Sequence, residues 1–433
     1  MRTHWIGWAL AAGTMPLWIS ACGPAPAPQP KSHTNSSKSP AKPKPAAKAG
    51  QPASRLKVIA FYDQSMGTVA PDPFALIEAH PGLVTYLSPF WYEVSATGSL
   101  IAKPEGNAAT LAARDHLPLM PLINNAGGTD AFLHSATTRL QAVKNIVGLL
   151  KTHPYVGVNI DFQGLKASDS QDLTAFIKAL HQAMPAKDVL SMSVVPLNSG
   201  NGESSAYDLA QLNPLVNSMV LMAYDFHGDG TPPGPVSPYD WVKAGIAATL
   251  KAGVQPSKLY LGIANYGYLW TDGSTHATTI PLKIMHQHKY GVYHWSPTYK
   301  EAYDTYTVNG TRHVIWFVND RAAVDRIRLA EADHLAGVAF WRVGYEDATW
   351  WNAVAKAILT PSGSSSTTSA ARHPATARHL KKALNAPAHR AGKTLQKSAV
   401  KTRRTLKGPA KKTLIAPAQK AKHTVKKATH PHP

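Results

Sequence analysis

Eight short apolar runs within residues 57–360 are the feature that most restricts the fold of this chain. Most of them are continuous rather than alternating, as expected for parallel strands that are buried on both faces. Amphipathic stretches separate the runs, for example Leu173, Phe176, Ile177 and Leu180 at helical spacing. We expect strands at Lys57–Tyr62, Leu83–Ser88, Pro118–Ile123, Val156–Asp161, Leu190–Val195, Met219–Tyr224, Leu259–Ala264 and Val338–Trp341.

Eight strands that alternate with helices predict an α/β fold, a closed (β/α)8 TIM barrel over residues 57–360. The alternative is an open doubly wound sheet, but no GxGxxG or GxxxxGK[ST] motif follows a strand, so nothing supports a nucleotide site. The segment of the chain between Ala264 and the helix expected near Asp320 has too many residues for a simple loop. A small α+β insertion is therefore expected after strand seven, at about residues 266–318.

The net charge of +20 is carried by the two ends of the chain. Residues 57–360 hold 21 basic and 25 acidic residues, a net charge of −4, whereas residues 361–433 hold 17 Lys or Arg and no acid. Residues 23–56 are rich in Pro, Ala and Lys and lack apolar periodicity, which predicts a semi-extended tether. Residues 361–433 are expected to be a disordered Lys/Ala/Pro-rich basic tail.

The first 22 residues have the layout of a secretory signal peptide. Arg2 precedes an apolar stretch from Trp5 to Ile19, and the small pair Ser20–Ala21 precedes Cys22, the only cysteine. The run Leu17–Cys22 resembles the bacterial lipobox, which implies a lipid on Cys22 and a position outside the cell, on the outer face of the membrane. The alternative is a short membrane anchor with an incidental cysteine.

The expected location outside the cell limits the possible partners of the basic tail. The composition of the tail suits binding to nucleic acid as well as to other polyanions. A chain tethered outside the membrane meets anionic wall polymers or lipid headgroups first, so we expect these partners and disfavour nucleic acid. A merely solubilising tail is the alternative.

The functional site of a (β/α)8 barrel lies at the carboxyl ends of its strands. The fourth strand ends in GVNIDFQGL, where alternate side chains face the same way. The sixth ends in MAYDFHG, the seventh in GIANYGY, the eighth in GVAFWRVG, and the second runs into SPFWYEV. These ends supply the candidate site residues Asn159, Asp161, Gln163, Met222, Tyr224, Asp225, Tyr266, Trp341 and Tyr92.

These motifs resemble those of glycoside hydrolase family 18, over about residues 57–358. The family has an Asp-x-Asp-x-Glu run at strand four, Met-x-Tyr-Asp at strand six and a Trp at strand eight. The match is closest to the subgroup of bacterial spore-cortex and cell-wall lysis, through the WY after strand two, the YGY after strand seven and Trp316–Phe317. The resemblance implies an N-acetylglucosamine-containing polysaccharide as substrate, of peptidoglycan or chitin type.

The resemblance also implies roles for single residues. Asp161 matches the Asp that stabilises the substrate's own N-acetyl group as nucleophile. Tyr224 matches the Tyr that hydrogen-bonds the acetamido carbonyl, and Asp225 lies beside it. Trp341 matches the Trp beneath the bound sugar. The other possibility is structural: Asp161 as a buried carboxylate of the barrel, and Trp341 as core packing.

Gln163 departs from the family pattern, because it stands where the family has its acidic Glu. An amide has no proton to release near neutral pH. Loss of a general acid costs about 10²–10⁴ in rate, so we expect a glycan-binding protein with lost or weak hydrolysis. The alternatives are an active N-acetylhexosaminidase that uses another acid, Glu93 or Glu346, and a structural wall organiser. The histidines form no HExxH motif, and we predict no metal and no cofactor.

Overall fold

The computed structural model describes residues 55–64, 74–106, 108–200, 202–271, 273–287 and 293–360. The predicted signal peptide with Cys22, almost all of the tether and the basic tail lie outside these ranges. Within them, no helix combines the length and the apolar character needed to cross a membrane.

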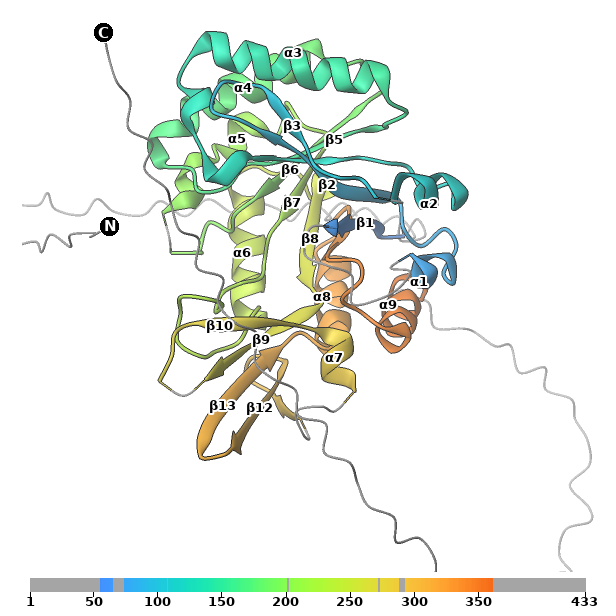
Figure 1. Ribbon diagram of the computed structural model, residues 1–433, viewed down its shortest axis with the longest axis vertical. Coiled ribbons are helices and arrows are strands. Elements are labelled where there is room, and N and C mark those ends of the chain that lie inside the picture. Colours follow the sequence, from blue (N-terminus) through green and yellow to red (C-terminus); the bar gives the residue numbers. More distant parts are fainter. Residues whose placement is uncertain are drawn as a thin grey trace, which may run out of the picture. The chain divides into compact units, whose positions relative to one another are not determined.

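A closed barrel of eight parallel strands forms the body of the protein (Figure 1). The strands follow the order β1-β14-β8-β7-β6-β5-β4-β2, and pairing of β1 with β2 closes the ring. The predicted TIM barrel is thereby confirmed. Its strands are β1 (Lys57–Tyr62), β2 (Tyr86–Val94), β4 (Leu122–Asn125), β5 (Gly157–Asp161), β6 (Val189–Val194), β7 (Ser218–Leu221), β8 (Leu259–Ala264) and β14 (Gly337–Trp341).

Alternate strand residues fill the inside of the barrel. One apolar cluster gathers interior side chains from five strands and from Met120, two residues before β4. Its members are Ile59, Phe61, Met120, Leu122, Val220, Tyr260 and Ala339, with Phe90 and Trp341 packed on it. The remaining strand residues pack outward in a separate, larger cluster with the helices. Polar side chains that point inward near the carboxyl ends of the strands therefore lie between this apolar cluster and the barrel mouth.

Helices alternate with the strands along the chain and cover the barrel. Four residues of α4, Leu173, Phe176, Ile177 and Leu180, are buried at the predicted spacing. The helices are α1 (Ala75–Glu78), α2 (Ala108–Arg114), α3 (Ala136–Thr152), α4 (Ser170–Ala183), α5 (Leu209–Leu212), α6 (Tyr239–Lys251), α7 (Leu282–His286), α8 (Asp320–Ala332) and α9 (Ala348–Leu359).

The second strand differs from the prediction. We expected it to end at Ser88, but β2 continues to Val94 and pairs there with the short antiparallel strand β3 (Leu100–Ala102). The register between β2 and β4 shifts between Phe90 and Tyr92, which marks a bulge. The bulge changes which side chains face inward beyond Phe90.

Between β8 and α8 lies a second sheet, where the sequence predicts an insertion. Its five antiparallel strands follow the order β10-β9-β13-β12-β11, and α7 lies within the same segment. In Figure 1 this sheet lies at the lower end, opposite α3 and α4. The strands are β9 (Tyr266–Thr271), β10 (Ala277–Pro281), β11 (His294–Ser296), β12 (Glu301–Val308) and β13 (Thr311–Phe317).

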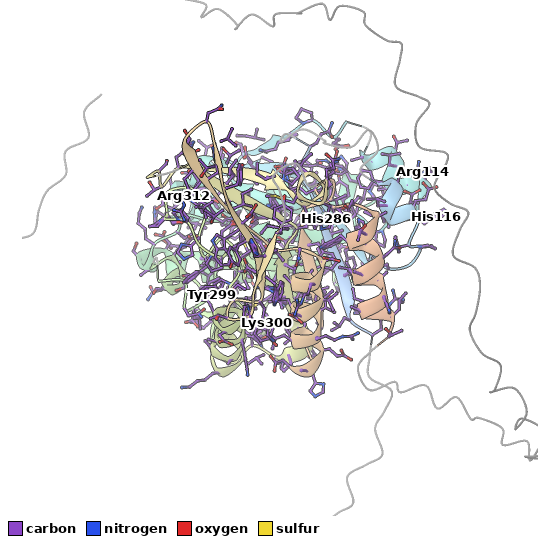
Figure 2. The ribbon with its side chains drawn as sticks, turned by 90° about the horizontal axis from the view of Figure 1, so that it is seen from below. Arg114, His116, His286, Tyr299, Lys300 and Arg312 are labelled. Carbon is purple, nitrogen blue, oxygen red and sulfur yellow. The ribbon has the colours of Figure 1, made fainter. Side chains whose placement is uncertain are left out.

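A buried ion pair fastens this second sheet to the barrel. Glu301 on β12 lies 3.1 Å from the Arg326 guanidinium on α8, and both side chains are almost completely buried. Glu301 also accepts hydrogen bonds from the backbone N–H groups of Val236 and Ser237, at 2.9 and 2.6 Å. The neighbouring Lys300, labelled in Figure 2, lies 3.6 Å from the ring centroid of Tyr239 on α6. The sheet therefore has a fixed position beside the loop that follows β7.

Candidate active site

Asp161 occupies the last position of β5 and points into the barrel. It is 4% exposed, and its neighbours across the sheet are Asn124 on β4 and Ser193 on β6. Burial raises the pKa of Asp161 to about 6, while hydrogen bonds from Gln163 and Asn124 oppose this rise. The site therefore holds a desolvated carboxyl that titrates close to neutral pH.

Gln163 lies directly above Asp161 and is exposed. Its side-chain nitrogen Nε2 donates to both carboxylate oxygens of Asp161, each at 3.0 Å, and lies 3.7 Å from the Met222 sulfur. The amide is thus in direct contact with the Asp161 carboxylate. It stabilises the Asp161 anion but has no proton to give up.

The backbone around Gln163 is clamped from both sides. Asn125 accepts from the Gln163 N–H and donates to the Gln163 carbonyl, both at 2.8 Å. On the other side, Glu203 Oε1 accepts from the Gly164 N–H at 2.7 Å. The Tyr207 hydroxyl donates to the Phe162 carbonyl at 2.6 Å. Together these contacts fix the direction of the Gln163 side chain.

Tyr224 follows β7, close to Asp161. Burial together with the charge of Asp161 raises the pKa of its hydroxyl well above the usual value. A glycine makes room for the ring: a Cβ on Gly262 of β8 would lie 2.9 Å from Tyr224 Cε1. The hydroxyl is therefore protonated and able to donate beside Asp161.

Asp225 is held by tyrosines from the first strand of the second sheet. The hydroxyls of Tyr266 and Tyr268 donate to Asp225 Oδ1 at 2.6 and 2.9 Å. Asp225 itself has a φ of 58°, a left-handed conformation that is uncommon outside glycine. The tyrosines thus fix the carboxylate next to Tyr224.

Trp341 ends β14 and packs against Phe61 of β1, with ring centroids 5.7 Å apart. It is half-buried and sits on top of the interior apolar cluster. The next residue, Arg342, pairs with Asp63 at 3.2 Å and donates to the Asp63 carbonyl at 2.8 Å. These buried contacts join the ends of β1 and β14 and hold the indole at the barrel mouth.

Two residues predicted to bind substrate do not lie beside the Asp161 carboxylate at the barrel mouth. Asn159 is fully buried one layer below Asp161, where it donates to Ser191 at 2.9 Å and accepts from Ser193 at 3.0 Å. Tyr92 faces α3 on the outside of the barrel, because the bulge in β2 turns it away from the interior. Its hydroxyl lies 2.9 Å from that of Tyr155.

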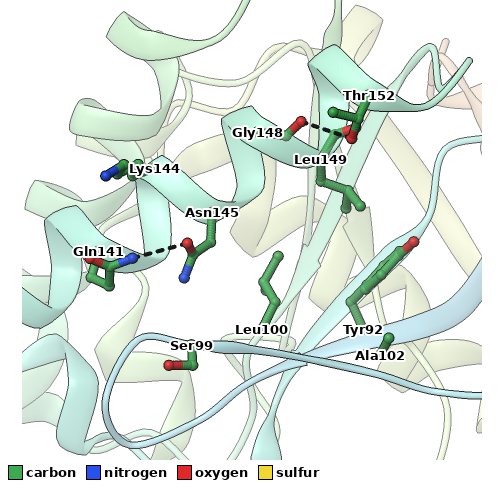
Figure 3. A pocket seen from close by; sticks show the side chains of 10 residues that line it. All are labelled: Tyr92, Ser99, Leu100, Ala102, Gln141, Lys144, Asn145, Gly148, Leu149 and Thr152. Carbon is green, nitrogen blue, oxygen red and sulfur yellow. Dashed lines mark hydrogen bonds between the residues drawn. The ribbon is translucent and has the colours of Figure 1, made fainter.

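Figure 3 shows the surroundings of Tyr92. The ring lines a groove of about 670 Å³ between the β2–β3 hairpin and α3, together with Leu100, Leu149 and Thr152. This groove is separate from the barrel mouth. The expected contact of Tyr92 with substrate at the site of Asp161 is therefore not compatible with its position.

The two acids considered as replacements for the missing proton donor are both engaged. Glu346 is buried. Its carboxylate accepts hydrogen bonds from the Asn265 amide, the Trp351 indole N–H and the backbone N–H of Tyr345, all within 3.0 Å. Glu93 pairs with Lys103 at 3.0 Å. It lies in register with Asn124, which lies in register with Asp161, so two strand spacings, about 10 Å, separate Glu93 from Asp161.

The sequence analysis did not single out Asn124, Asn125 or Glu203. Asn124 and Asn125 follow the same rule as the predicted residues, since they end β4. Glu203 gives no local signal: it belongs to the 3-10 turn Glu203–Ala206 in the loop after β6. Only the fold places it beside residue 164.

Asp130, His134 and Asp169 are the described residues whose ligand atoms are spaced as in a metal site. Their oxygens already have partners, because Lys166 pairs with Asp130 at 2.5 Å and the Lys166 N–H donates to Asp169 at 2.8 Å. We interpret the cluster as an ion-pair network that joins the loops after β4 and β5.

Comparison with known proteins shows which family this chain resembles. The profile of glycosyl hydrolases family 18 matches residues 58–346. An uncharacterized glycosylase of Bacillus subtilis, YvbX, is 27% identical over 239 residues, which are 52% of this chain and 67% of that protein. The cortical fragment-lytic enzyme of Bacillus anthracis is 22% identical over 280 residues, 60% of this chain and 65% of that protein.

Solved structures agree on the fold. The spore cortex-lytic enzyme SleL of Bacillus megaterium superposes with a TM-score of 0.62 at 22% identity, over 69% of this chain and 73% of that one. The family match covers the barrel and every residue of the group around Asp161. The chain belongs to glycosyl hydrolases family 18.

Proposed function

We propose that the barrel mouth binds N-acetylglucosamine-containing glycan and hydrolyses it only slowly. The observation that carries this proposal is the pairing of Gln163 with Asp161, in which an amide occupies the position of the family's proton donor. The groups needed to hold the sugar are retained around it. The rate is limited at the step that needs a proton on the glycosidic oxygen.

The retained groups suit an N-acetylated sugar. Trp341 offers an apolar face at the mouth, and Tyr224 offers a donor for the acetamido carbonyl. Asp161 is desolvated, so its negative charge acts strongly on the acetamido N–H. These three contacts together favour an N-acetylhexosamine over an unsubstituted hexose.

Binding is tested by calorimetric titration of the full-length protein with chitin tetrasaccharide, with cellotetraose as the control ligand. We expect binding of the N-acetylated oligomer alone. Trp341→Ala should weaken it by about two- to tenfold, since the loss of an aromatic contact costs about 0.5–1.5 kcal/mol. No binding, or equal binding of cellotetraose, contradicts the proposal.

We also propose that the protein acts outside the cell, tethered by a lipid on Cys22. The support is the sequence of residues 1–22, with the only cysteine at the end of an apolar stretch. Cys22→Ser should release the protein from membranes or block its maturation. Unchanged membrane retention, with no lipid mass on the wild-type protein, contradicts this.

For the basic tail we propose anionic wall polymers or lipid headgroups as partners. Its 17 Lys or Arg without any acid should give binding that weakens steeply with salt. Deletion of residues 364–433 should remove salt-sensitive retention on isolated cell walls and leave the binding of chitin tetrasaccharide intact. Equal retention of the truncated protein contradicts the assignment.

A further inference from the structure

A row of aromatic side chains crosses the second sheet. Tyr268 on β9 lies opposite Trp316 on β13, and Trp316 lies opposite Tyr303 on β12. Tyr303 in turn lies opposite His294 on β11, the strand at the edge of the sheet. Directly opposed residues of antiparallel strands have their side chains on the same face. The row therefore spans four strands on one face, over about 14 Å at the usual strand spacing.

The row becomes more exposed with distance from the barrel. At its inner end, the Tyr268 ring is buried and its hydroxyl donates to Asp225 of the site at 2.9 Å. Trp316 and Tyr303 are partly exposed and stack on each other, with ring centroids 4.9 Å apart. His294, at the outer end, is exposed. The row thus begins at the site and reaches the surface.

Tyr299, labelled in Figure 2, adds a fourth aromatic ring to the exposed part of the row. It is 40% exposed and meets Trp316 edge-on, with ring centroids 5.6 Å apart. We call Tyr299, Trp316, Tyr303 and His294 the aromatic strip. Aromatic side chains of this kind offer apolar faces together with polar edges at a surface.

The segment that follows β7 connects the strip with the barrel mouth. Phe226 comes directly after Asp225 and is also 40% exposed, and its ring lies 5.1 Å from that of Trp241 on α6. At the start of the same helix, the Tyr239 N–H donates to the Tyr299 carbonyl at 3.1 Å. An exposed aromatic side chain therefore lies at each end of this segment, one beside the site and one in the strip.

The chemistry of the strip suits a neutral sugar chain. A pyranose has apolar C–H faces that pack on aromatic rings and hydroxyl groups that bond their polar edges. None of the four side chains is an acid, a lysine or an arginine, so the strip offers no fixed charge to a polyanion or to an acidic peptide. A glycan held at the mouth also presents its further sugars to the strip at a high effective concentration.

Resting on the proposed function, we propose that the aromatic strip binds the part of a longer N-acetylglucosamine-containing chain that extends beyond the barrel mouth. The mouth holds the sugar beside Asp161, and the strip holds more distant sugars of the same chain. The preferred ligand is then the polymer rather than a short fragment.

Tyr299→Ala tests the inference, because it removes an exposed ring and keeps the carbonyl that accepts from Tyr239. We expect the affinity of the full-length protein for chitin hexasaccharide, measured by calorimetric titration, to fall by about two- to tenfold. The affinity for chitin disaccharide should remain unchanged, because the shorter ligand occupies the mouth alone. Tyr303→Ala should have the same selective effect.

Tyr306→Ala is the matched control. Tyr306 lies on the same strand as Tyr303 but on the opposite face of the sheet, where its ring stacks on His313. This variant should leave both affinities unchanged. Trp341→Ala should lower both affinities, because its ring lies at the mouth that both oligomers occupy.

Two results overturn the inference and leave the proposed binding at the mouth standing. One is an unchanged hexasaccharide affinity in Tyr299→Ala and Tyr303→Ala, or an equal loss for both oligomers. The other is a wild-type dimer that Tyr299→Ala dissociates in sedimentation velocity, because a second copy of the chain would then cover the strip. A wild type that binds neither oligomer contradicts the proposed function as well.

Discussion

The side-chain nitrogen of Gln163 lies 3.0 Å from each carboxylate oxygen of Asp161. This contact favours the Asp161 anion and partly offsets the cost of burying it. In the family pattern a carboxyl would share a proton at this point, whereas the amide turns the pair into a fixed donor and acceptor. On the proposed function, this pair allows the site to bind glycan while it limits turnover.

The burial of Asp161 should make the protein less stable at neutral than at acidic pH. Its pKa is raised from 3.8 to about 6, so the native state holds the proton more tightly than the unfolded state. Stability from this group is present below pH 4 and is lost as the pH rises through about 6. The loss amounts to about 3 kcal/mol at most.

Asp161→Asn removes this titration. The variant should gain free energy of unfolding relative to wild type at pH 7 and lose that advantage at pH 4. Urea unfolding at both pH values checks the difference. Glu301 and Glu346 titrate in both proteins and cancel in the comparison. An equal difference at both pH values would show that Asp161 is not desolvated in the native state.

Tyr224→Phe should weaken ligand binding more than it lowers stability. In the wild type the hydroxyl is expected to donate to the acetamido carbonyl, so without it the affinity for chitin tetrasaccharide should fall by about tenfold. The free energy of unfolding should change by less than about 1 kcal/mol. Tyr260→Phe, deeper in the barrel, is the matched control and should leave affinity unchanged. Unaltered affinity in Tyr224→Phe would remove this residue from the binding site.

The ion pair of Glu301 with Arg326 predicts a large effect on stability. Arg326→Met leaves the buried Glu301 carboxylate without its cation, which typically costs about 3–5 kcal/mol. Adding Glu301→Gln should restore part of the loss, because no unpaired charge then remains. Chemical unfolding measures both. A loss below about 1 kcal/mol in the single variant would mean that the second sheet is not fastened by this pair.

The barrel could be predicted because its signal is local. Continuous apolar runs set β1 and β8 at the same limits in sequence and structure, Lys57–Tyr62 and Leu259–Ala264. The residues at the ends of β5 and β7 could be placed for the same reason. Strand alternation and the barrel rule bring Asp161, Gln163 and Tyr224 together without knowledge of distant contacts.

The remainder depends on contacts that no local pattern records. The bulge in β2 reverses the direction of Tyr92, and a hydrophobic sequence does not reveal where a bulge falls. Glu346 looks available after β14, yet Asn265 and Trp351, from β8's end and α9, enclose it. Glu203 is 39 residues from Gly164 and meets it only in the folded barrel.

The most direct test of the central claim is the rate of chitin tetrasaccharide hydrolysis by wild type and by Gln163→Glu, measured across pH. The substitution supplies a proton donor in nearly the same volume. We predict an increase of about two orders of magnitude or more, a rate that falls at alkaline pH as the new acid loses its proton, and loss of the gain when Asp161→Asn is added. Rapid hydrolysis by the wild type, or no gain from Gln163→Glu, would contradict the claim that the amide at this position limits turnover.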